Sequence, residues 1–383
     1  MTCDDPIYLD YNATTPIAAE VVEAMLPYLT THFGNPSSGH VYGGRARTAV
    51  ELARSQVAGL IGAAASDIVF TGSGSEANNL LILGLANKAR PSLADDRRHV
   101  VFSAVEHPAV AKPCRSLAAQ GWRVSVIPVD RLGRVDMERA ASLLSGGAAL
   151  VSVMHSNNEV GSVQPIAELA GLAHRAGALM HTDAAQSIGK VPLDVDRLAV
   201  DAMTIVGHKI YAPKGIGALY LRDRGRIAPV MLGGGQEQGA RPGTENVALI
   251  VALGAACALA ARRIDDDQRH LRAMRDRLMT ALQAGVPGLL INGDPATGLP
   301  NCLNVSFPGV LGSRVLAGAR TVAASTGSAC HEGGESPSDV LVAMGCDRDR
   351  ALGAVRLSVG RPTTAAMVDT AAASLIRAWR DAT

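Results

Sequence analysis

Two stretches of sequence decide the fold class. Residues 178–186 read ALMHTDAAQ, and residues 202–209 read AMTIVGHK. Each begins with an apolar run of strand length and ends in polar side chains, which is typical of strands buried on both faces of a parallel sheet. Runs of the same kind recur along the chain, so the expected strands are 68–71, 99–104, 124–129, 149–155, 178–183, 202–206 and 217–221.

The gaps between these strands contain helical periodicity, for example at 165–176. Strands that alternate with helices predict an α/β fold with a mainly parallel sheet. From residue 262 the pattern changes, because a charged helix is expected over 262–284, followed by separate strands at 302–307 and 355–359 and a helix after Thr364. We therefore expect a large domain over 15–261 and a smaller α+β domain formed by 1–14 and 262–383.

The composition excludes several classes of protein. Of the 383 residues, 48% are hydrophobic and 19% are charged, which rules out a disordered chain. The net charge of +1 and the aromatic content of 3% favour neither direct nucleic-acid binding nor an anionic membrane surface. The uncharged run 247–261 is too short to span a bilayer, and the N-terminal sequence has no apolar core of a signal peptide.

The six cysteines do not have the spacing of a zinc site, so no metal is expected. A long chain without a secretory signal keeps its thiols reduced, which favours a cytoplasmic location. Lysine is scarce, and any lysine chemistry therefore has five candidates: Lys88, Lys112, Lys190, Lys209 and Lys214.

A glycine-rich loop, TGSGSEA at 71–77, follows an expected strand and opens a helix. Its small residues let backbone N–H groups approach an anion at the positive end of the helix. Read literally, Gly72–Ala77 matches the G-x-G-x-x-A dinucleotide pattern, but the acid that should end the next strand is missing, because Asp95 and Asp96 precede that strand. A dinucleotide, another phosphate and a plain tight turn all stay open at this point.

Asp183 and Lys209 each stand at the end of an expected strand, where open parallel sheets place their ligands. Each alone has an ordinary structural explanation, as a helix cap or a solvated charge. Together with a phosphate loop they are what pyridoxal 5'-phosphate requires. The lysine would form the covalent link to the cofactor aldehyde, and the aspartate would keep the pyridine nitrogen protonated.

Further motifs extend the comparison to nearly the whole chain. They are YLDYNATTP at 8–16, GNPSS at 34–38, EH at 106–107, NNE at 157–159, HTDAAQ at 181–186, GHKIY at 207–211, RPGTEN at 241–246, GSAC at 327–330 and RLSVGR at 356–361. With these motifs in this order the chain resembles the cysteine desulfurases and selenocysteine lyases. These are pyridoxal-phosphate enzymes of fold type I in the class V aminotransferase group.

The resemblance implies a role for each matching residue. Lys209 would link to the cofactor and move protons, Asp183 would pair with the pyridinium, and His107 would stack on the ring unless it only caps a helix. The remaining cofactor contacts would come from Gln186 and Asn158 at the ring hydroxyl and from Gly74, Ser75, His208 and the neighbouring subunit's Thr244 at the phosphate. Arg356 and Asn158, with Asn35 as a further helper, would bind the substrate carboxylate.

Cys330 would be the sulfur-accepting nucleophile by the same resemblance. Its flanks, CHEGGES at 330–336, are polar and glycine-rich, which predicts an exposed loop rather than a buried structural cysteine. Glu332 and Glu335 would raise the pKa of the thiol if they lie near it, so the substrate-bound site must activate it, with His107 as a proton carrier.

The leading hypothesis is a homodimeric cysteine desulfurase that converts L-cysteine to L-alanine and passes a Cys330 persulfide to an acceptor protein such as an iron–sulfur scaffold. The main alternative is a selenocysteine lyase, which the Cys330-His331 pair, Pro242 and Val206 favour. Val206 stands where many desulfurases have a serine, so one phosphate hydroxyl is missing. A class V aminotransferase would not need Cys330, a nicotinamide-dependent oxidoreductase would use the loop at 72–77, and a non-catalytic scaffold would not need the lysine, aspartate and cysteine.

Overall fold

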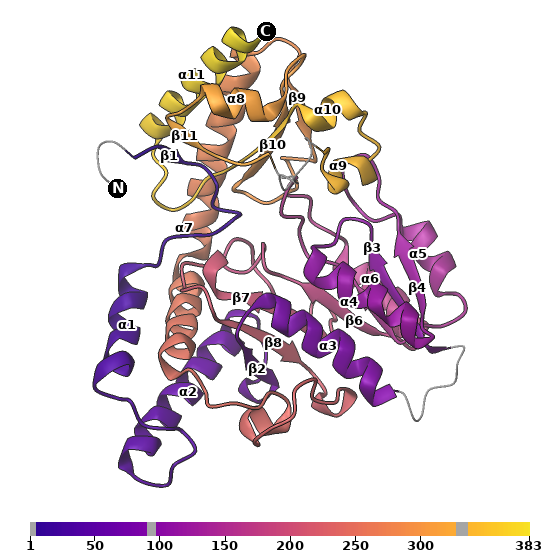
Figure 1. The fold of residues 1–383 in the computed structure, drawn as a ribbon, viewed down its shortest axis with the longest axis vertical. Helices are drawn as coiled ribbons and strands as arrows, with labels where there is room; N and C mark the ends of the chain where they lie inside the picture. Colours follow the sequence, from indigo (N-terminus) through magenta and orange to yellow (C-terminus); the bar gives the residue numbers. More distant parts are fainter. Residues whose placement is uncertain (1–4, 90–96, 327–335) are drawn as a thin grey trace.

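The computed structural model describes residues 5–89, 97–326 and 336–383 (Figure 1). The strands are β1 (Ile7–Tyr8), β2 (Ile68–Thr71), β3 (His99–Ser103), β4 (Arg123–Ile127), β5 (Leu150–Ser152), β6 (Leu179–Asp183), β7 (Ala202–Val206), β8 (Gly217–Leu221), β9 (Leu290–Asn292), β10 (Cys302–Ser306), β11 (Val322–Ala323) and β12 (Ala354–Ser358). The α-helices are α1 (Ala19–Thr30), α2 (Val41–Leu60), α3 (Gly74–Ala89), α4 (Pro108–Ser116), α5 (Met137–Leu144), α6 (Ile166–Arg175), α7 (Val247–Gly285), α8 (Gly312–Gly318), α9 (Asp339–Ala343), α10 (Arg348–Leu352) and α11 (Ala365–Ala382).

The central sheet has seven strands in the order β2-β8-β7-β6-β5-β3-β4. Neighbours from β7 to β4 pair in parallel, and only β8 runs the other way, since it is antiparallel to both β2 and β7. The predicted α/β class with a mainly parallel sheet is therefore confirmed. Four strands of this sheet are shorter than predicted. β3, β4 and β6 are shorter by one residue each, and β5 covers only Leu150–Ser152 where 149–155 was expected.

Alternate residues of the strands pack into two separate cores, as expected when both faces of a sheet are covered. Val100 and Leu179 belong to the core under α3 and α4, whereas Val101 and Met180 belong to the core under α2, α6 and the first half of α7. The sheet is thus a rigid middle layer between helices. Its strand ends can position side chains precisely.

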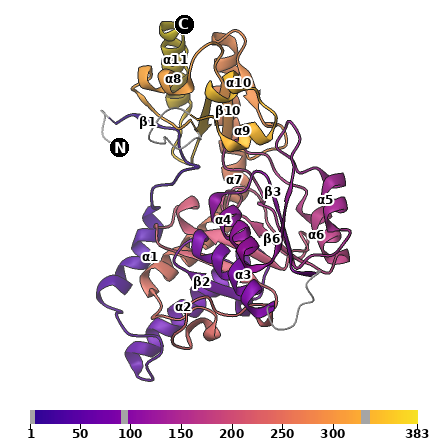
Figure 2. The same cartoon turned by 45° about the vertical axis from the view of Figure 1, so that its right-hand side comes forward.

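A second group of elements lies at one end of the molecule (Figures 1 and 2). An antiparallel sheet of order β12-β10-β9 and the parallel pair β1-β11 pack against α8, α11 and the second half of α7. The charged segment 262–284 is not a separate helix, because α7 continues unbroken for 39 residues across position 261. Neither glycine nor proline interrupts residues 255–284, so nothing in the chain ends the helix there. The domain limits at 14/15 and 261/262 stay predictions.

By length and composition alone, α7 contains a window of 18 residues apolar enough to cross a membrane, with a mean hydropathy of 1.9. Within the described chain, however, 56% of that window is buried. The first half of α7 packs on α1 and α2 (Figure 1), so its apolar face is already used in the large core. This is the pattern of a core helix.

Candidate active site

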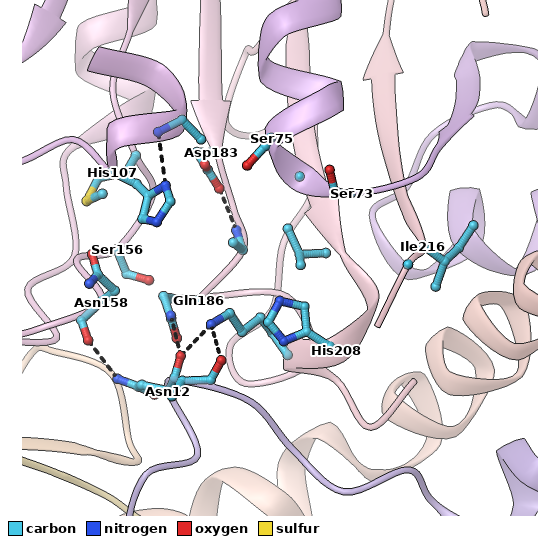
Figure 3. Close-up of a pocket in the computed structure, with 18 of the residues that line it drawn as sticks. Asn12, Ser73, Ser75, His107, Ser156, Asn158, Asp183, Gln186, His208 and Ile216 are labelled. Atoms are coloured by element: carbon cyan, nitrogen blue, oxygen red, sulfur yellow. Dashed lines mark hydrogen bonds between the residues drawn. The ribbon is translucent and has the colours of Figure 1, made fainter. Parts of the chain in front are cut away.

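A cavity of about 360 Å³ opens where β6 and β7 end (Figure 3). It is lined by side chains from distant parts of the sequence. The predicted site residues that it brings together are Gly74, Ser75, His107, Asn158, Asp183, Gln186, His208, Lys209 and Arg356. The strand ends therefore place the predicted lysine, aspartate and phosphate loop around one space.

Lys209 follows β7 in a single 3₁₀ turn, Gly207–Lys209. Its Nζ donates hydrogen bonds to the backbone oxygens of Asn12 at 2.5 Å and Ala13 at 2.7 Å. Burial lowers the pKa of Lys209 to about 8, an effect that the Arg356 charge adds to and that Asp10 and Asp183 oppose. A neutral amine is the form that attacks an aldehyde, and near neutral pH this site makes that form accessible.

Asp183 is held in one orientation by two donors. The amide of Asn78 donates to its Oδ2 at 2.8 Å, and the backbone N–H of Ala185 donates to its Oδ1 at 3.0 Å. The side chain is 7% exposed and lines the cavity. The two donors therefore fix the plane of the carboxylate beside the cavity, where it can pair with a ring nitrogen.

A chain of buried hydrogen bonds continues behind Asn78. The Thr204 hydroxyl donates to Asn78 Oδ1 at 2.6 Å, and Thr204 Oγ1 lies 3.1 Å from His181 Nε2. His181 Nδ1 lies 2.8 Å from the Ser152 hydroxyl. Because Thr204 already gives its proton to Asn78, it must accept from His181, which fixes the Nε2–H tautomer. Burial lowers the pKa of His181 to about 4, so the ring is neutral.

The phosphate loop is preorganised by its own side chains. Ser73 Oγ accepts from the Glu76 N–H at 3.1 Å, and Glu76 Oε2 accepts from the Gly72 N–H at 2.7 Å. This reciprocal capping leaves the first-turn N–H groups of α3 facing the cavity, and such groups bind anions. A Cβ at Gly74 would meet Val206 Cγ2 at 2.4 Å, so the glycine is required by this close approach.

His107 is the N-cap of α4, and its Nδ1 accepts the Ala109 N–H at 3.1 Å. The cap role considered from the sequence is thus present, and the same ring also lines the cavity (Figure 3). Since Nδ1 is an acceptor, the ring proton is on Nε2. Burial, more than the nearby Lys209 charge, lowers the pKa of His107, so the neutral ring is favoured.

Arg356 projects from β12 and contacts two groups at the cavity. It donates to Asp10 Oδ1 at 2.8 Å and to the Asn158 backbone oxygen at 3.1 Å. Its buried Nε has no hydrogen-bond partner in the described part of the chain. Arg356 lines the cavity, and a guanidinium is suited to bind a carboxylate.

The sequence did not single out several residues of this site. Asp10 and Asn12 lie in the YLDYNATTP motif, which was read only as part of a resemblance. Asn78, Thr204 and Ser152 occupy ordinary helix and strand positions, so only the three-dimensional contacts reveal them. Lys190 had one signal, since it is one of five lysines in the chain.

Two of the predicted residues, Asn35 and Thr244, do not line this cavity. Asn35 is exposed, and its Oδ1 accepts the Ser37 N–H at 2.9 Å. Thr244 is also exposed and does not line the cavity of its own chain, where the neighbouring Arg241 pairs with Glu76 at 2.7 Å. Cys330 lies outside the described residues. The roles of all three stay predictions.

The residues present fit pyridoxal phosphate. The cavity offers an amine with a lowered pKa, a carboxylate held in place by two donors, and a helix N-terminus. The close packing of Gly74 on Val206 shapes the floor beneath the helix N-terminus. Among the described residues no group of three His, Cys, Asp or Glu side chains could hold a metal ion.

Comparisons with known proteins place the chain in a family. The model of the family "Aminotransferase class-V" matches residues 7–370. A cysteine desulfurase of Rattus norvegicus is 43% identical over 367 residues, which cover 95% of this chain and 80% of the relative. A solved NifS-like protein is 33% identical with a TM-score of 0.89, covering 97% of this chain and 98% of that one.

A further solved structure, described as SspA in complex with cysteine, is 34% identical with a TM-score of 0.81 and covers 93% of this chain and 99% of that one. These findings confirm the predicted fold type and pyridoxal phosphate, the cofactor of this family. They leave no support for a nicotinamide-dependent oxidoreductase. The chain is a member of the aminotransferase class-V family and is similar within it to cysteine desulfurases.

Proposed function

We propose that this enzyme removes sulfur from L-cysteine, forms L-alanine and carries the sulfur as a persulfide on Cys330 to an acceptor protein. The observation that carries the proposal is the meeting of Lys209, Asp183 and Arg356 around one cavity. Relatives that are cysteine desulfurases cover 95% of the chain, which confirms the predicted class of activity. Nothing in the comparisons favours the selenocysteine lyase.

Substrate binding is assigned to the small-domain side of the cavity. Arg356 lines the cavity, and its guanidinium would bind the carboxylate of the amino acid. The carbonyl of Asn158 and the carboxylate of Asp10 already fix the guanidinium, so its plane is set before the substrate arrives. A preset guanidinium loses less conformational entropy on binding than a free one.

Lys209 and His107 would move the protons. The Lys209 amine, with its pKa lowered to about 8, can accept a proton from the substrate Cα at neutral pH. The pKa of His107 is lowered, so its ring is neutral, and it would take up the thiol proton at Nδ1 once that nitrogen releases the Ala109 N–H. Pyridoxal phosphate, when bound, supplies an electron sink for the negative charge that develops on the substrate carbon.

Sulfur transfer balances without an external oxidant. The Cys330 thiolate attacks the substrate sulfur, a new S–S bond forms, and the Cβ–S bond breaks with its electron pair left on carbon. A proton delivered to Cβ then completes alanine. The persulfide sulfur is later transferred to the acceptor, for which an iron–sulfur scaffold protein is our proposal.

A homodimer is part of the proposal. Large apolar side chains are exposed on and after α1 and directly before Gly233, among them Leu29, Phe33 at 72% and Leu232 at 91%. Exposed apolar groups of this size are typical of an interface. An exposed Thr244 beside such a surface is available to the phosphate site of a second copy. A cytoplasmic location is proposed from the unpaired buried thiols of Cys114, Cys257 and Cys302.

The test is alanine release from L-cysteine with wild type, Cys330→Ala and the control Cys346→Ala, a second cysteine that is partly exposed. The proposal expects loss of alanine release only in Cys330→Ala, with the cofactor still linked to Lys209. Unchanged release in that variant would contradict the mechanism. Sedimentation of the active enzyme as a monomer would contradict the shared site.

A further inference from the structure

Lys190 is buried without a carboxylate partner. It is 6% exposed, and the described part of the chain places no acidic side chain in ion-pair contact with it. Lysines are almost never buried in this way unless they are paired, because the charged form is poorly solvated. The charged groups that act on it are Lys209 and Arg356. Both are cations, which makes the position costlier still.

The lysine uses its N–H groups on two amide oxygens. Nζ donates to Gln186 Oε1 at 3.0 Å and to Asn12 Oδ1 at 3.3 Å. Because an amine of lysine bound in this way is a donor, the atoms that face it must be the oxygens of both amides. This settles the orientation of the Gln186 amide, which is otherwise ambiguous between its oxygen and its nitrogen.

The fixed orientation has a consequence at the cavity. Gln186 Nε2 is placed on the side of Asn12, where it donates to the backbone oxygen of Asn12 at 3.0 Å. The same oxygen accepts from Lys209 at 2.5 Å, so Nε2 and the Lys209 amine lie around one acceptor (Figure 3). The amide therefore presents a donor, and not an acceptor, beside the reactive lysine.

Asn12 is held in turn from several directions. Its Oδ1 also accepts from Asn301 at 2.9 Å, and its Nδ2 donates to the Asn158 backbone oxygen at 3.2 Å. The residue is 1% exposed. Asn12 is therefore a rigid support, and the Gln186 amide is held between the Asn12 backbone oxygen, which faces its nitrogen, and the Lys190 amine, which faces its oxygen.

We propose that Lys190 is a positioning residue that fixes the Gln186 amide with its nitrogen toward Lys209 and the cofactor ring oxygen. The inference rests on the proposed function and deepens it. It also explains why the site keeps a costly buried amine, since a side chain of the same length without a donor would leave the buried Gln186 oxygen unpartnered and the amide held by the Asn12 backbone oxygen alone.

The test uses Lys190→Met, which keeps the length and removes the donor, with Gln186→Ala, the double variant and the exposed control Lys88→Met. The first readout is the pH titration of the visible absorbance of the Lys209–cofactor link. A donor at the ring oxygen and a nearby positive charge both disfavour protonation of that link. We expect its pKa to rise by about one unit in Lys190→Met and in Gln186→Ala, and not in Lys88→Met.

The double variant separates positioning from direct charge. If Lys190 acts through Gln186, the shift in the double variant equals that of Gln186→Ala alone. Additive shifts, or no shift in Lys190→Met, would overturn the proposal. A wild type without any Lys209–cofactor link would contradict the cofactor assignment and with it both proposals.

The second readout is thermal unfolding of the apoprotein. If Lys190 had a merely structural role, its replacement would act mainly on this readout. Removing a poorly solvated amine offsets the lost hydrogen bonds, so the Tm of Lys190→Met should stay within about 4 °C of wild type. A variant that fails to fold would show that the lysine is needed for stability and would overturn the positioning role.

Discussion

Thr204→Val perturbs the cofactor site from behind, without touching the cavity. The Thr204 hydroxyl is the link between Asn78 and His181, and all three side chains are at most 1% exposed. Valine has nearly the same shape, so the change removes one hydroxyl and little else. The account predicts two separate effects, one on stability and one on cofactor affinity.

The stability cost follows from the groups left without a partner. His181 can move its proton to Nδ1 and donate to the Ser152 hydroxyl, because a hydroxyl can also accept. Asn78 Oδ1 has no alternative donor when the Thr204 hydroxyl is removed. One orphaned buried acceptor costs about 1–3 kcal/mol, which is the expected fall in the free energy of unfolding.

The affinity effect follows from Asp183. Its Oδ2 accepts from the Asn78 amide, and that amide loses the partner that fixes it. Hydrogen bonds to a charged group contribute about 1.5–3 kcal/mol. Partial loss of this bond should weaken pyridoxal phosphate binding about tenfold.

Urea unfolding of the apoprotein and cofactor titration measure the two effects. The matched control is Thr182→Val on the neighbouring strand, where the hydroxyl donates to the Val153 backbone oxygen at 2.8 Å and is equally buried. The control should lose stability but keep its cofactor affinity. Equal cofactor affinities in wild type, Thr204→Val and Thr182→Val would refute the chain of hydrogen bonds as a support of Asp183.

Three further changes test other parts of the structure. Gly74→Ala should reduce cofactor binding and lower stability by about 1–3 kcal/mol, because its Cβ would lie 2.4 Å from Val206. Adding Val206→Ala to this variant should restore cofactor affinity in a binding assay and stability in an unfolding assay. Burial raises the pKa of Glu106 from 4.5 to about 8, so between these pH values the folded state keeps a proton that the unfolded state has lost, and stability falls as pH rises. Glu106→Gln should therefore flatten the fall in the Tm of the apoprotein measured from about pH 5 to 8. An equal slope in wild type and Glu106→Gln would contradict the assignment. Glu237→Ala leaves its partner Arg54 without this buried carboxylate and should lower the free energy of unfolding in urea by about 3–5 kcal/mol. Glu51→Ala removes an exposed partner of the same Arg54 and should lower it by less than about 1 kcal/mol.

The sequence predicted the layers of the fold well where apolar runs are bounded by polar residues. Strands at 68–71, 202–206 and 217–221 match β2, β7 and β8. The run at 149–155 was predicted too long, because β5 covers only Leu150–Ser152, although the N–H groups of Val153 and His155 still donate to backbone oxygens of β6. Nothing local distinguishes such a continuation from the strand itself.

The helix α7 was divided in the prediction because its composition changes at residue 262. The composition changes because the environment changes: the first half of α7 lies in the large core, and the second half is more exposed. Such a change in composition does not indicate the end of a helix. Helix ends need a terminator, and the sequence has none at this point.

The site was predictable in its reactive residues and not in their supports. Lys209 and Asp183 stand at strand ends, where position alone suggests function. Thr204 and Asn78 are polar residues inside regular elements, and their partners are 126 positions apart in the chain. Only tertiary packing brings such residues together.

The central claim is that Cys330 receives sulfur from L-cysteine in the site built around Lys209. The most direct measurement is the mass of the peptide that contains Cys330, isolated under non-reducing conditions after a single turnover with L-cysteine. The account predicts one added sulfur atom on Cys330 and one alanine for each persulfide, with neither product in Lys209→Ala. Alanine formed while Cys330 gains no sulfur would contradict it.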